Sequence, residues 1–440
     1  MGCRPGTQDI SSSLLRAWHA PVNLNPFCGS TDIRHRRLPI KIMISQNIDY
    51  FICLHSNGVL CLKMDLRYHA NLMLHLMNDG TTFLLPSVLP LIVLEYGFSF
   101  STAGFISAII PFCLGVFQTP IGRVSDRMSS ALLLRSGMLL VAVGSLLVAL
   151  VPWLFIPSMF LLGIGGSFYH PVGYAYTSKI VRNSNSGAAL GLQVSSGDIG
   201  ILLAFLTAGP IAIIGGWRAT FMVWGVMGIV AFLLSSFMLK EEGSSAQAPP
   251  SSRDFSVLRK REAILIMILF ALLGAVVRVL NTYLPTLFFI QGIDITTADA
   301  ITALFIGAGI VGGIISGRLL DRYGGRRVTF LLFASTAAVL LMMYPTYPVL
   351  LATLMVALVG LVSVGLYPAL YFLMSQATSG KIIGTSYGLL LSIGMLSGIV
   401  SVTVGGYIID IAPQMIYVFA AFLALLAAAL SFRLPRLNGN

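Results

Sequence analysis

Apolar residues fill this chain in long runs that are broken only by short polar turns. Residues 328–380 contain no Asp, Glu, Lys, Arg or His over 53 positions. About 20 helical residues span a bilayer, so this run predicts two membrane-spanning helices with a turn at 344–348, Tyr-Pro-Thr-Tyr-Pro. Membrane β-strands instead alternate polar and apolar residues over about 10 positions. The pattern therefore predicts an all-α polytopic membrane protein.

From Met64 onward the same pattern predicts twelve transmembrane helices in two sets of six. The first set covers 71–94, 101–121, 131–151, 155–178, 187–214 and 219–239, and the second covers 263–289, 299–317, 328–344, 348–374, 384–409 and 414–433. Residues 240–262 form the longest polar stretch of the body and are rich in Ser, Pro and charge, which predicts a cytoplasmic linker. We therefore expect an N-terminal half at 64–239 and a C-terminal half at 263–440 with a short cytoplasmic tail.

Composition supports this class and excludes others. Hydrophobic residues make up 56% of the 440 residues and charged residues 10%, whereas a soluble domain carries about 25% charged residues. Mean hydropathy is +0.88. A water-soluble fold cannot hide so much apolar surface, so a soluble enzyme, a nucleic-acid-binding protein and a disordered chain are all excluded.

The net charge of +11 is explained by membrane topology rather than by a nucleic-acid partner. Of the 20 basic residues after residue 63, 18 fall on one side of the predicted helices; the exceptions are Arg218 on the other side and Arg278 within a span. The opposite turns carry acidic residues, namely Glu95, Asp294, Asp299 and Asp410. This asymmetry predicts cytoplasmic termini, and we expect a multi-pass protein of the plasma membrane.

Residues 1–63 differ from the body, because they hold four of the five cysteines and no apolar run long enough to span a membrane. No signal-peptide pattern is present either. We expect a disordered extension, or a segment upstream of a natural start at Met64; the alternative is a regulatory or targeting tail. The cysteine spacing predicts neither a metal site nor disulfides.

A short motif recurs in the second loop of each half, at an offset of 195 residues. The first copy contains Gly122, Asp126 and Arg127, and the second contains Gly317, Asp321, Arg322, Arg326 and Arg327. Duplicated six-helix units are typical of transporters whose halves rock about a central site.

The second copy, G-x-x-x-D-R-x-G-x-R-R, resembles the signature loop of the major facilitator superfamily, and the resemblance covers about 64–436. It implies that superfamily's fold and alternating access. Gly317 is then expected to let two helices approach closely, and Asp321 to pair with loop arginines as a cytoplasmic latch. The alternative for Arg326 and Arg327 is positive-inside anchoring. The first copy lacks the second glycine and the basic pair after Arg127.

A narrower resemblance links two spans to the fosmidomycin-resistance branch of the superfamily. It is carried by His75-Leu-Met-Asn-Asp79-Gly in the first helix and by Gly-Gly-Ser-Phe-Tyr-His170-Pro171 in the fourth. This resemblance implies drug export. The arginine of drug-exporter fourth helices is absent from this chain.

Five ionisable groups lie inside the predicted spans, namely His75, Asp79, His170, Asp198 and Arg278. Each costs roughly 2.5–3.5 kcal/mol at mid-bilayer on insertion scales, so each should face a cavity and have a partner. His75 and Asp79 are four residues apart and share one helix face. Asp79, His75, His170 and Asp198 are our proton-coupling candidates, because carboxyl and imidazole groups can hold and pass a proton. The alternative is structural hydrogen bonding between helices.

Arg278 is the candidate for substrate binding, because a lone arginine in a cavity can grip a carboxylate or phosphonate. Asn281 lies three residues later, on the same helix face. We also expect Asp198 and Arg278 to meet or to share a substrate; the alternative for Arg278 is an ion pair that holds the halves together. Further candidates for lining the cavity are Gln118, Gln193, Tyr367 and Tyr371.

These features predict a secondary active transporter that moves a small organic solute, with proton-coupled efflux of a drug or metabolite as the first hypothesis. An uptake symporter for an organic anion gripped by Arg278 is the second. A remote alternative is a membrane enzyme with His75, Asp79 and His170 as metal ligands. We expect a monomer with no cofactor or metal, and no Walker motif for ATP is present.

Overall fold

The computed structural model describes residues 40–44, 50–55, 59–125, 128–180, 186–239, 259–344, 347–377 and 383–434. The chain divides into two compact units, one within residues 1–63 and one that comprises 64–440 together with 47–49. The predicted linker at 240–262 lies outside the described residues as far as residue 258.

The first unit contains a three-stranded sheet in the order β1-β2-β3. Its strands are β1 (Ile40–Ile44), β2 (Tyr50–His55) and β3 (Val59–Met64). β1 and β2 pair in antiparallel fashion, with Ile40 opposite Leu54. The expectation of an unstructured extension does not hold for these strands, whose isoleucines, valine, Tyr50 and Phe51 favour extended backbone. The rest of that extension lies outside the described residues.

The second unit consists of helices throughout its described part, and the predicted all-α membrane fold is confirmed. The N-terminal half contains α2 (Leu66–Thr82), α3 (Leu84–Tyr96), α4 (Phe100–Ser125), α5 (Ser130–Leu150), the short η2 (Pro152–Leu154), α6 (Phe155–Gly166), α7 (Tyr169–Ile180), α8 (Ser186–Gly215) and α9 (Trp217–Met238). The C-terminal half contains α10 (Arg261–Ile290), α11 (Ile295–Tyr323), α12 (Gly325–Met342), α13 (Val349–Val364), α14 (Leu366–Ala377), α15 (Ile383–Ile411) and α16 (Met415–Ser431).

Eleven described segments are long and apolar enough to cross a membrane, and the 17-residue α16 is a shorter apolar helix. Three of the eleven are broken spans formed by α2 with α3, by α6 with α7 and by α13 with α14. Each break lies three or four residues before a proline, namely Pro86, Pro171 or Pro368. Proline cannot donate to the carbonyl four residues earlier, so the helix ladder is interrupted at that point.

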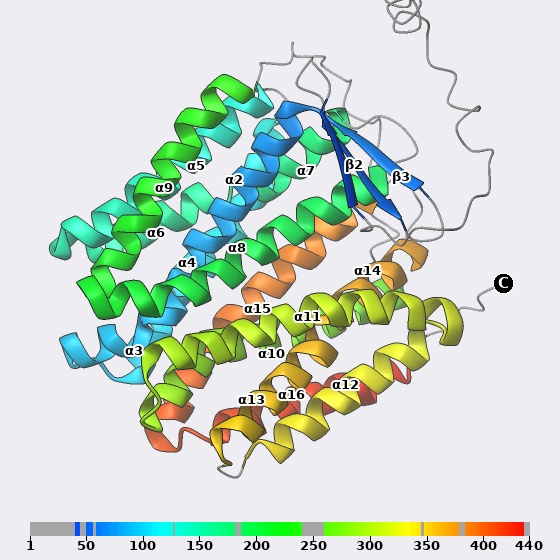
Figure 1. Ribbon diagram of the computed structural model, residues 1–440. Coiled ribbons are helices and arrows are strands. Elements are labelled where there is room, and N and C mark those ends of the chain that lie inside the picture. The colour runs from blue at the N-terminus through cyan, green and yellow to red at the C-terminus, as the bar shows by residue number, and fades with distance from the viewer. Residues whose placement is uncertain are drawn as a thin grey trace, which may run out of the picture. The chain divides into compact units, whose positions relative to one another are not determined.

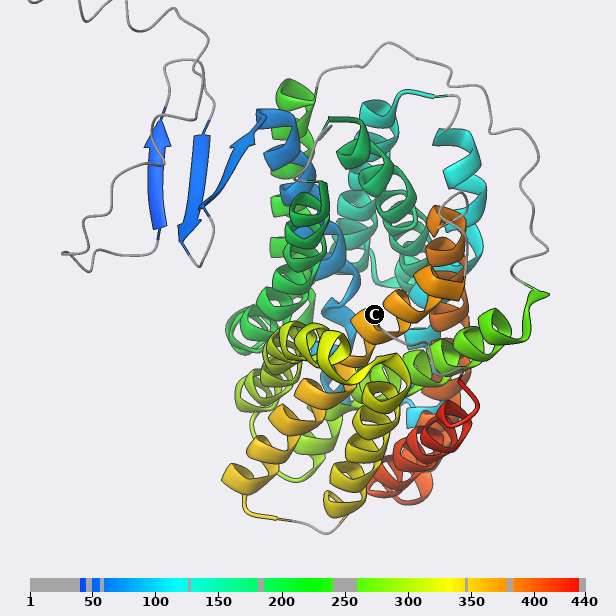
Figure 2. The same ribbon diagram turned by 90° about the vertical axis from the view of Figure 1, so that its right-hand side faces the viewer.

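Alternating helix directions give the bundle two ends. We call the end where α9 finishes and α10 begins the linker end, and the opposite end the far end. Figures 1 and 2 show the N-terminal half in blue to green and the C-terminal half in yellow-green to red. The halves meet mainly where α4 packs on α15, α8 on α11 and α3 on α10, with a smaller contact between α3 and α11.

A polar contact closes the far end between the halves. Asp410 near the end of α15 accepts hydrogen bonds from the backbone N–H groups of Phe100 at 2.7 Å and of Ser101 at 2.8 Å. These groups open α4, where the first N–H groups have no partner within the helix and the helix dipole favours negative charge. One half therefore caps a helix of the other.

Arg218, the one basic residue predicted on the far side, lies at the far end beside an acid. Its guanidinium is 2.7 Å from Glu95 Oε1, and it donates to the Tyr96 hydroxyl at 2.9 Å. Trp217 Nε1 donates to Glu95 Oε2 at 2.6 Å. These contacts join α3 to the start of α9 within the N-terminal half.

Candidate transport site

Three predicted proton-coupling residues meet inside the N-terminal half. His75 and Asp79 lie on α2, and His170 lies at the start of α7 beside the proline break. His75 Nε2 is 3.2 Å from Asp79 Oδ2, and His170 Nε2 is 3.6 Å from Asp79 Oδ1. Asn78 Nδ2 also donates to Asp79 Oδ1 at 2.9 Å. We call His75, Asp79 and His170 the carboxyl–imidazole cluster.

The hydrogen-bond network assigns the proton position on His75. His75 Nδ1 lies 2.5 Å from the carbonyl oxygen of Gln193. A carbonyl oxygen only accepts, so Nδ1 carries the hydrogen. In a neutral ring Nε2 would then present its lone pair to the Asp79 carboxylate, an arrangement of two acceptors. A proton or another cation must therefore lie between His75 and Asp79, or His75 must be charged.

Small residues let α8 approach the cluster. A Cβ atom added at Gly197 would lie 2.6 Å from both Asp79 Oδ2 and His75 Nε2. One added at Gly200 would meet the backbone of Leu76. α8 therefore packs closely on α2 at this segment, and the Gln193 carbonyl reaches His75.

Tyrosine rings enclose the two imidazoles, a feature that was not predicted from the sequence. The ring of His75 stacks on Tyr169 with centroids 4.4 Å apart, and that of His170 stacks on Tyr174 at 6.1 Å. Tyr169 donates to the backbone oxygen of Asn71 at 2.8 Å. The available signal was spacing, since Tyr169 directly precedes His170 and Tyr174 follows it by one helical turn.

Arg278 lies in the middle of α10 without the partner that we expected. In the described part of the chain no ion pair joins Arg278 to Asp198. Its Nη2 lies 3.0 Å from the sulfur of Met395, and its guanidinium carbon lies 4.6 Å from the centre of the Phe83 ring. Phe83 sits at the break between α2 and α3, so Arg278 faces the N-terminal half at the level of the cluster.

The remaining binding candidates are dispersed around these groups. Gln193 is buried, and its Nε2 donates to the Tyr169 hydroxyl at 3.2 Å. Asn281 Oδ1 and Gln118 Nε2 are buried without a hydrogen-bond partner among described residues. Tyr367 and Tyr371 both pack against Phe270, each with ring centroids 5.4 Å apart. Of this set only Gln193 contacts the cluster directly.

The predicted latch is described only in part. Asp126, Arg127 and the side chain of Asp321 lie outside the described residues. A Cβ at Gly122 would approach only Pro171 of the same half, at 3.5 Å, and one at Gly317 would meet no described atom within 4 Å. The expected close helix approach at Gly317 is therefore wrong for this conformation. The remaining basic residues of the motif are Arg322, which lies over the Tyr323 ring, the half-buried Arg326 and the exposed Arg327.

The cluster has ligand atoms suited to a metal ion. One nitrogen from each histidine and a carboxylate oxygen lie within 4.8 Å of one another. Two imidazoles and a carboxylate are a common three-ligand set for Zn²⁺, which leaves a fourth position open. The backbone acceptor on His75 Nδ1 is also typical of a metal-binding histidine.

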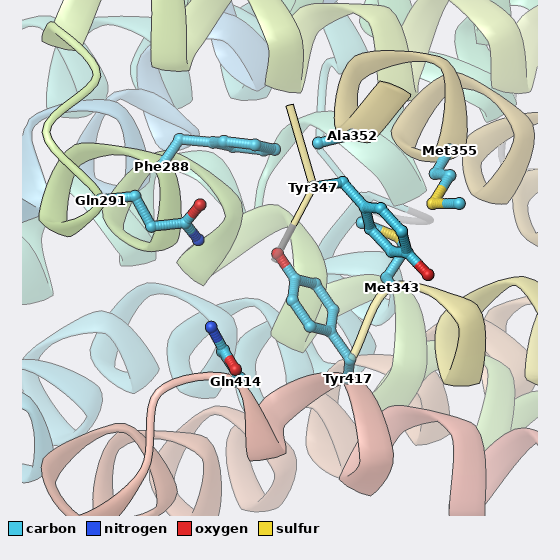
Figure 3. A pocket seen from close by; sticks show the side chains of 8 residues that line it. All are labelled: Phe288, Gln291, Met343, Tyr347, Ala352, Met355, Gln414 and Tyr417. Atoms are coloured by element: carbon cyan, nitrogen blue, oxygen red, sulfur yellow. The ribbon is translucent and has the colours of Figure 1, made fainter. Parts of the chain in front are cut away.

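A separate small pocket lies at the far end of the C-terminal half (Figure 3). It is lined by Phe288, Gln291, Met343, Tyr347, Ala352, Met355, Gln414 and Tyr417. Figure 3 shows Gln291, Gln414 and Tyr417 turned toward a common opening. None of these side chains carries a charge near neutral pH, so this pocket lacks the chemistry of the central site.

Known transporters share this fold and sequence pattern. A solved bacterial homologue of the human lysosomal transporter Spinster superposes with a TM-score of 0.70 at 14% identity, covering 84% of this chain and 96% of that one. The transporter YfnC of Bacillus subtilis, which is described as uncharacterized, is 24% identical over 82% of this chain and 90% of its own length. The gentisate transporter of Corynebacterium glutamicum is 25% identical over 72% of this chain and 74% of its own length.

The family match covers both halves of the bundle. Residues 72–298 and 290–438 match the Major Facilitator Superfamily. The matched ranges include the carboxyl–imidazole cluster, Arg278 and both copies of the duplicated loop. The chain belongs to the Major Facilitator Superfamily and is a multi-pass membrane transporter.

Proposed function

We propose that this protein is a proton-coupled symporter that takes up a small organic anion by alternating access. The proposal rests on one observation: the protonatable groups lie on one half of the bundle and the buried cation lies on the other. The protonatable cluster belongs to α2 and α7, whereas the cation Arg278 belongs to α10. A solute and a proton can therefore be bound at the same time, on separate groups.

Arg278 supports an anionic substrate. A charged side chain at membrane depth costs roughly 2.5–3.5 kcal/mol on insertion scales. The Arg278 guanidinium contacts a thioether and an aromatic ring, and it interacts electrostatically with Tyr367 and Asp79 without an ion pair to Asp79. A substrate carboxylate or phosphonate would supply two parallel hydrogen bonds and an opposite charge. The Phe83 ring adds an apolar surface for an organic body. A relative named for gentisate, an organic anion, agrees with this substrate class.

Coupling follows from the cluster. A proton held between His75 and Asp79 neutralises the carboxylate, and its loss leaves an uncompensated charge in a buried site. The carrier without substrate would then change between its two conformations readily only when the charge in the buried site is neutralised. Import requires the proton and the anion to travel together, whereas export by exchange requires them to compete for one group. Arg278 and the cluster belong to different halves and form no ion pair in the described chain, although their charges interact, and this division favours import over the efflux that the narrower family resemblance implies.

The proposed setting is the plasma membrane, with the linker end and both termini in the cytoplasm and the protein acting as a monomer. The support is the basic composition of the linker-end loops and the acidic far-end turns. Under this orientation the inward proton gradient drives accumulation of the anion inside the cell.

The test is transport in proteoliposomes under an imposed pH gradient. Radiolabelled carboxylates and phosphonates are offered beside their neutral amides or alcohols. We expect acid-outside vesicles to accumulate an anion and not its neutral analogue, and Arg278→Gln to lose this accumulation. Arg278→Lys keeps the charge but not the planar fork, so it should retain part of the flux. Equal flux in wild type and Arg278→Gln would contradict the anion proposal, and movement of solute against the proton flow would make the protein an exporter.

A divalent metal ion is the second candidate substrate, favoured by the three convergent ligands. The positive charge of Arg278 on the facing helix opposes it. Titration of purified protein with Zn²⁺ or Co²⁺ tests the idea. Micromolar binding that is lost in His170→Gln, together with metal flux in vesicles, would replace the organic anion with a metal as the cargo.

A further inference from the structure

We propose a second proton-binding site at Asp299, separate from the central cluster, that locks the far end of the transporter in its closed conformation. The inference rests on alternating access and not on the identity of the substrate. The sequence analysis placed Asp299 in a far-side turn. The structure starts α11 at Ile295, so Asp299 lies one turn inside the helix and its side chain is 0% exposed.

Asp299 lies at the junction of the two halves. It belongs to α11 of the C-terminal half, and its nearest polar neighbours are the Ser87 hydroxyl on α3 and the backbone of Gly209 on α8. Both neighbours belong to the N-terminal half. A Cβ at Gly209 would lie 2.7 Å from Thr296 Cα and 3.2 Å from Asp299 Oδ2. Direct contact between the two helix backbones therefore encloses the carboxyl group.

No cationic side chain of the described chain pairs with the Asp299 carboxyl group; the groups that lie near it and favour its charged form are the Ser87 hydroxyl and the Gly209 backbone. Neither oxygen of Asp299 has a neighbour with hydrogen-bond geometry, and the hydroxyls of Ser87 and Thr296 are also buried without one. The helices packed on α11 carry the charged residues Glu95 on α3, Asp198 on α8, Arg278 with the first turn of α10, and Arg326 and Arg327 at the opposite end on α12. None of these forms an ion pair with Asp299 in the described part of the chain.

Burial then fixes the charge state. An isolated carboxylate in an apolar interior is strongly destabilised and takes up a proton instead. When α3 and α8 move away from α11, water reaches the group and the proton is free to leave. Closing the far end again must either bury a charge or recover a proton. Proton binding at Asp299 and closure of the far end are therefore linked, each favouring the other.

The test measures far-end opening directly, without substrate. Spin labels are placed at Ile214 at the end of α8 and at Ile411 at the end of α15, both strongly exposed, in a variant whose five cysteines are replaced by serine. Distances are recorded in lipid nanodiscs between about pH 5 and about pH 8, the range in which buried carboxyl groups release protons. We expect a shift toward the longer distance as the pH rises.

Three variants separate the sites. Asp299→Asn has the same shape and no charge, so it should stay closed at the far end across this range. Asp79→Asn should retain a pH-dependent shift, because it leaves Asp299 intact. Asp294→Asn is the matched control: Asp294 is the exposed N-cap of α11, and the hydrogen bond from Thr297 lowers the pKa of Asp294, so it stays ionised throughout.

The outcomes distinguish this proposal from its alternatives. A pH response of Asp299→Asn equal to that of wild type overturns the lock. A shift that follows Na⁺ concentration at fixed pH also overturns it, since the site would then bind a metal cation. These distances depend on neither substrate nor Arg278, so a failed transport assay would leave the result interpretable.

Discussion

The Nδ1 atom of His75 lies 2.5 Å from the carbonyl oxygen of Gln193, and this contact determines what the other ring nitrogen can do. Because Nδ1 must donate, Nε2 faces Asp79 at 3.2 Å either as a proton donor or across a shared cation. One backbone carbonyl of α8 thus converts a pair of buried side chains on α2 into a proton-holding unit. The same contact connects that unit to a helix that packs on the other half.

Asp79→Asn should uncouple transport from the pH gradient. The amide cannot hold a proton between itself and His75, so accumulation driven by the gradient should fall to background. Exchange of labelled for unlabelled substrate at equal pH should persist, because Arg278 is untouched. Asp198→Asn is the comparison: Asp198 interacts electrostatically with Asp79 and His75 but forms no ion pair with His75 in the described chain, so it should retain more of the accumulation than Asp79→Asn. Full accumulation by Asp79→Asn would remove this residue from the coupling step.

Gly197→Ala should disturb the cluster by forcing α8 away from α2. The new methyl group would lie 2.6 Å from His75 Nε2 and Asp79 Oδ2, and overpacking of this kind costs about 1–3 kcal/mol. Thermal unfolding in detergent should show a lower midpoint, and gradient-driven flux should fall with it. Gly191→Ala is the matched control on the same helix, because its Cβ would meet no described atom within 4 Å. It should be neutral or stabilising by roughly 0.5–1 kcal/mol. An equal effect of the two substitutions would argue against the close approach.

The lengths of the apolar runs predicted the membrane helices well, because each must cover the bilayer with about 20 apolar residues. The breaks at Phe83 and Gly365 were not predicted, although Pro86 and Pro368 were visible in the sequence. A proline in the sequence shows which backbone carbonyl loses its hydrogen-bond donor. Whether the helix bends or breaks at that point depends on how the neighbouring helices pack. The strands at 40–64 were missed because three segments of five or six residues are too short to give a clear alternating pattern.

The central site was predicted in part. Spacing placed His75 and Asp79 on one face, and His170 was expected to face a cavity because a buried ionisable group needs a partner. The link between His75 and Gln193 could not be predicted, since it depends on a backbone oxygen of a helix more than 100 residues away. Asp299 was predicted in a turn because the predicted helix began at residue 299, whereas α11 begins at Ile295. This difference of four residues moves the carboxyl group from a solvated turn into a buried helix. Asp198 and Arg278 form no ion pair in the described chain, since charge alone does not specify which helix faces meet, and a shared substrate stays a prediction.

Gly398→Ala should weaken substrate binding without touching the cluster. A Cβ at Gly398 on α15 would lie 2.9 Å from Arg278 Cγ, so the side chain must move from its place beside Phe83. A displaced guanidinium loses the alignment that two parallel hydrogen bonds need, and we expect KM to rise roughly 10-fold, which is about 1.4 kcal/mol. Gly388→Ala on the same helix has no described atom within 4 Å and should leave KM unchanged. The measurement is KM, obtained from initial rates at several substrate concentrations. A KM equal to that of wild type in both variants would contradict the role of Arg278.

Asp410→Ala should open the far end by removing the cap that the C-terminal half places on α4. Loss of an N-cap carboxylate costs about 0.5–2 kcal/mol, and here the cost falls only on the conformation in which Asp410 reaches Phe100 and Ser101. The far-open population should therefore rise by a factor of roughly 2–30 relative to the closed one, read from the distances between labels at Ile214 and Ile411. Asp294→Ala also removes a helix cap, that of α11, but this cap lies within a single half and stabilises both conformations alike. Asp294→Ala should lower the midpoint of thermal unfolding and leave the distance distribution unchanged. A shift in distance of equal size in the two variants would show that loss of any helix cap, and not loss of the link between halves, changes the equilibrium between the open and closed conformations.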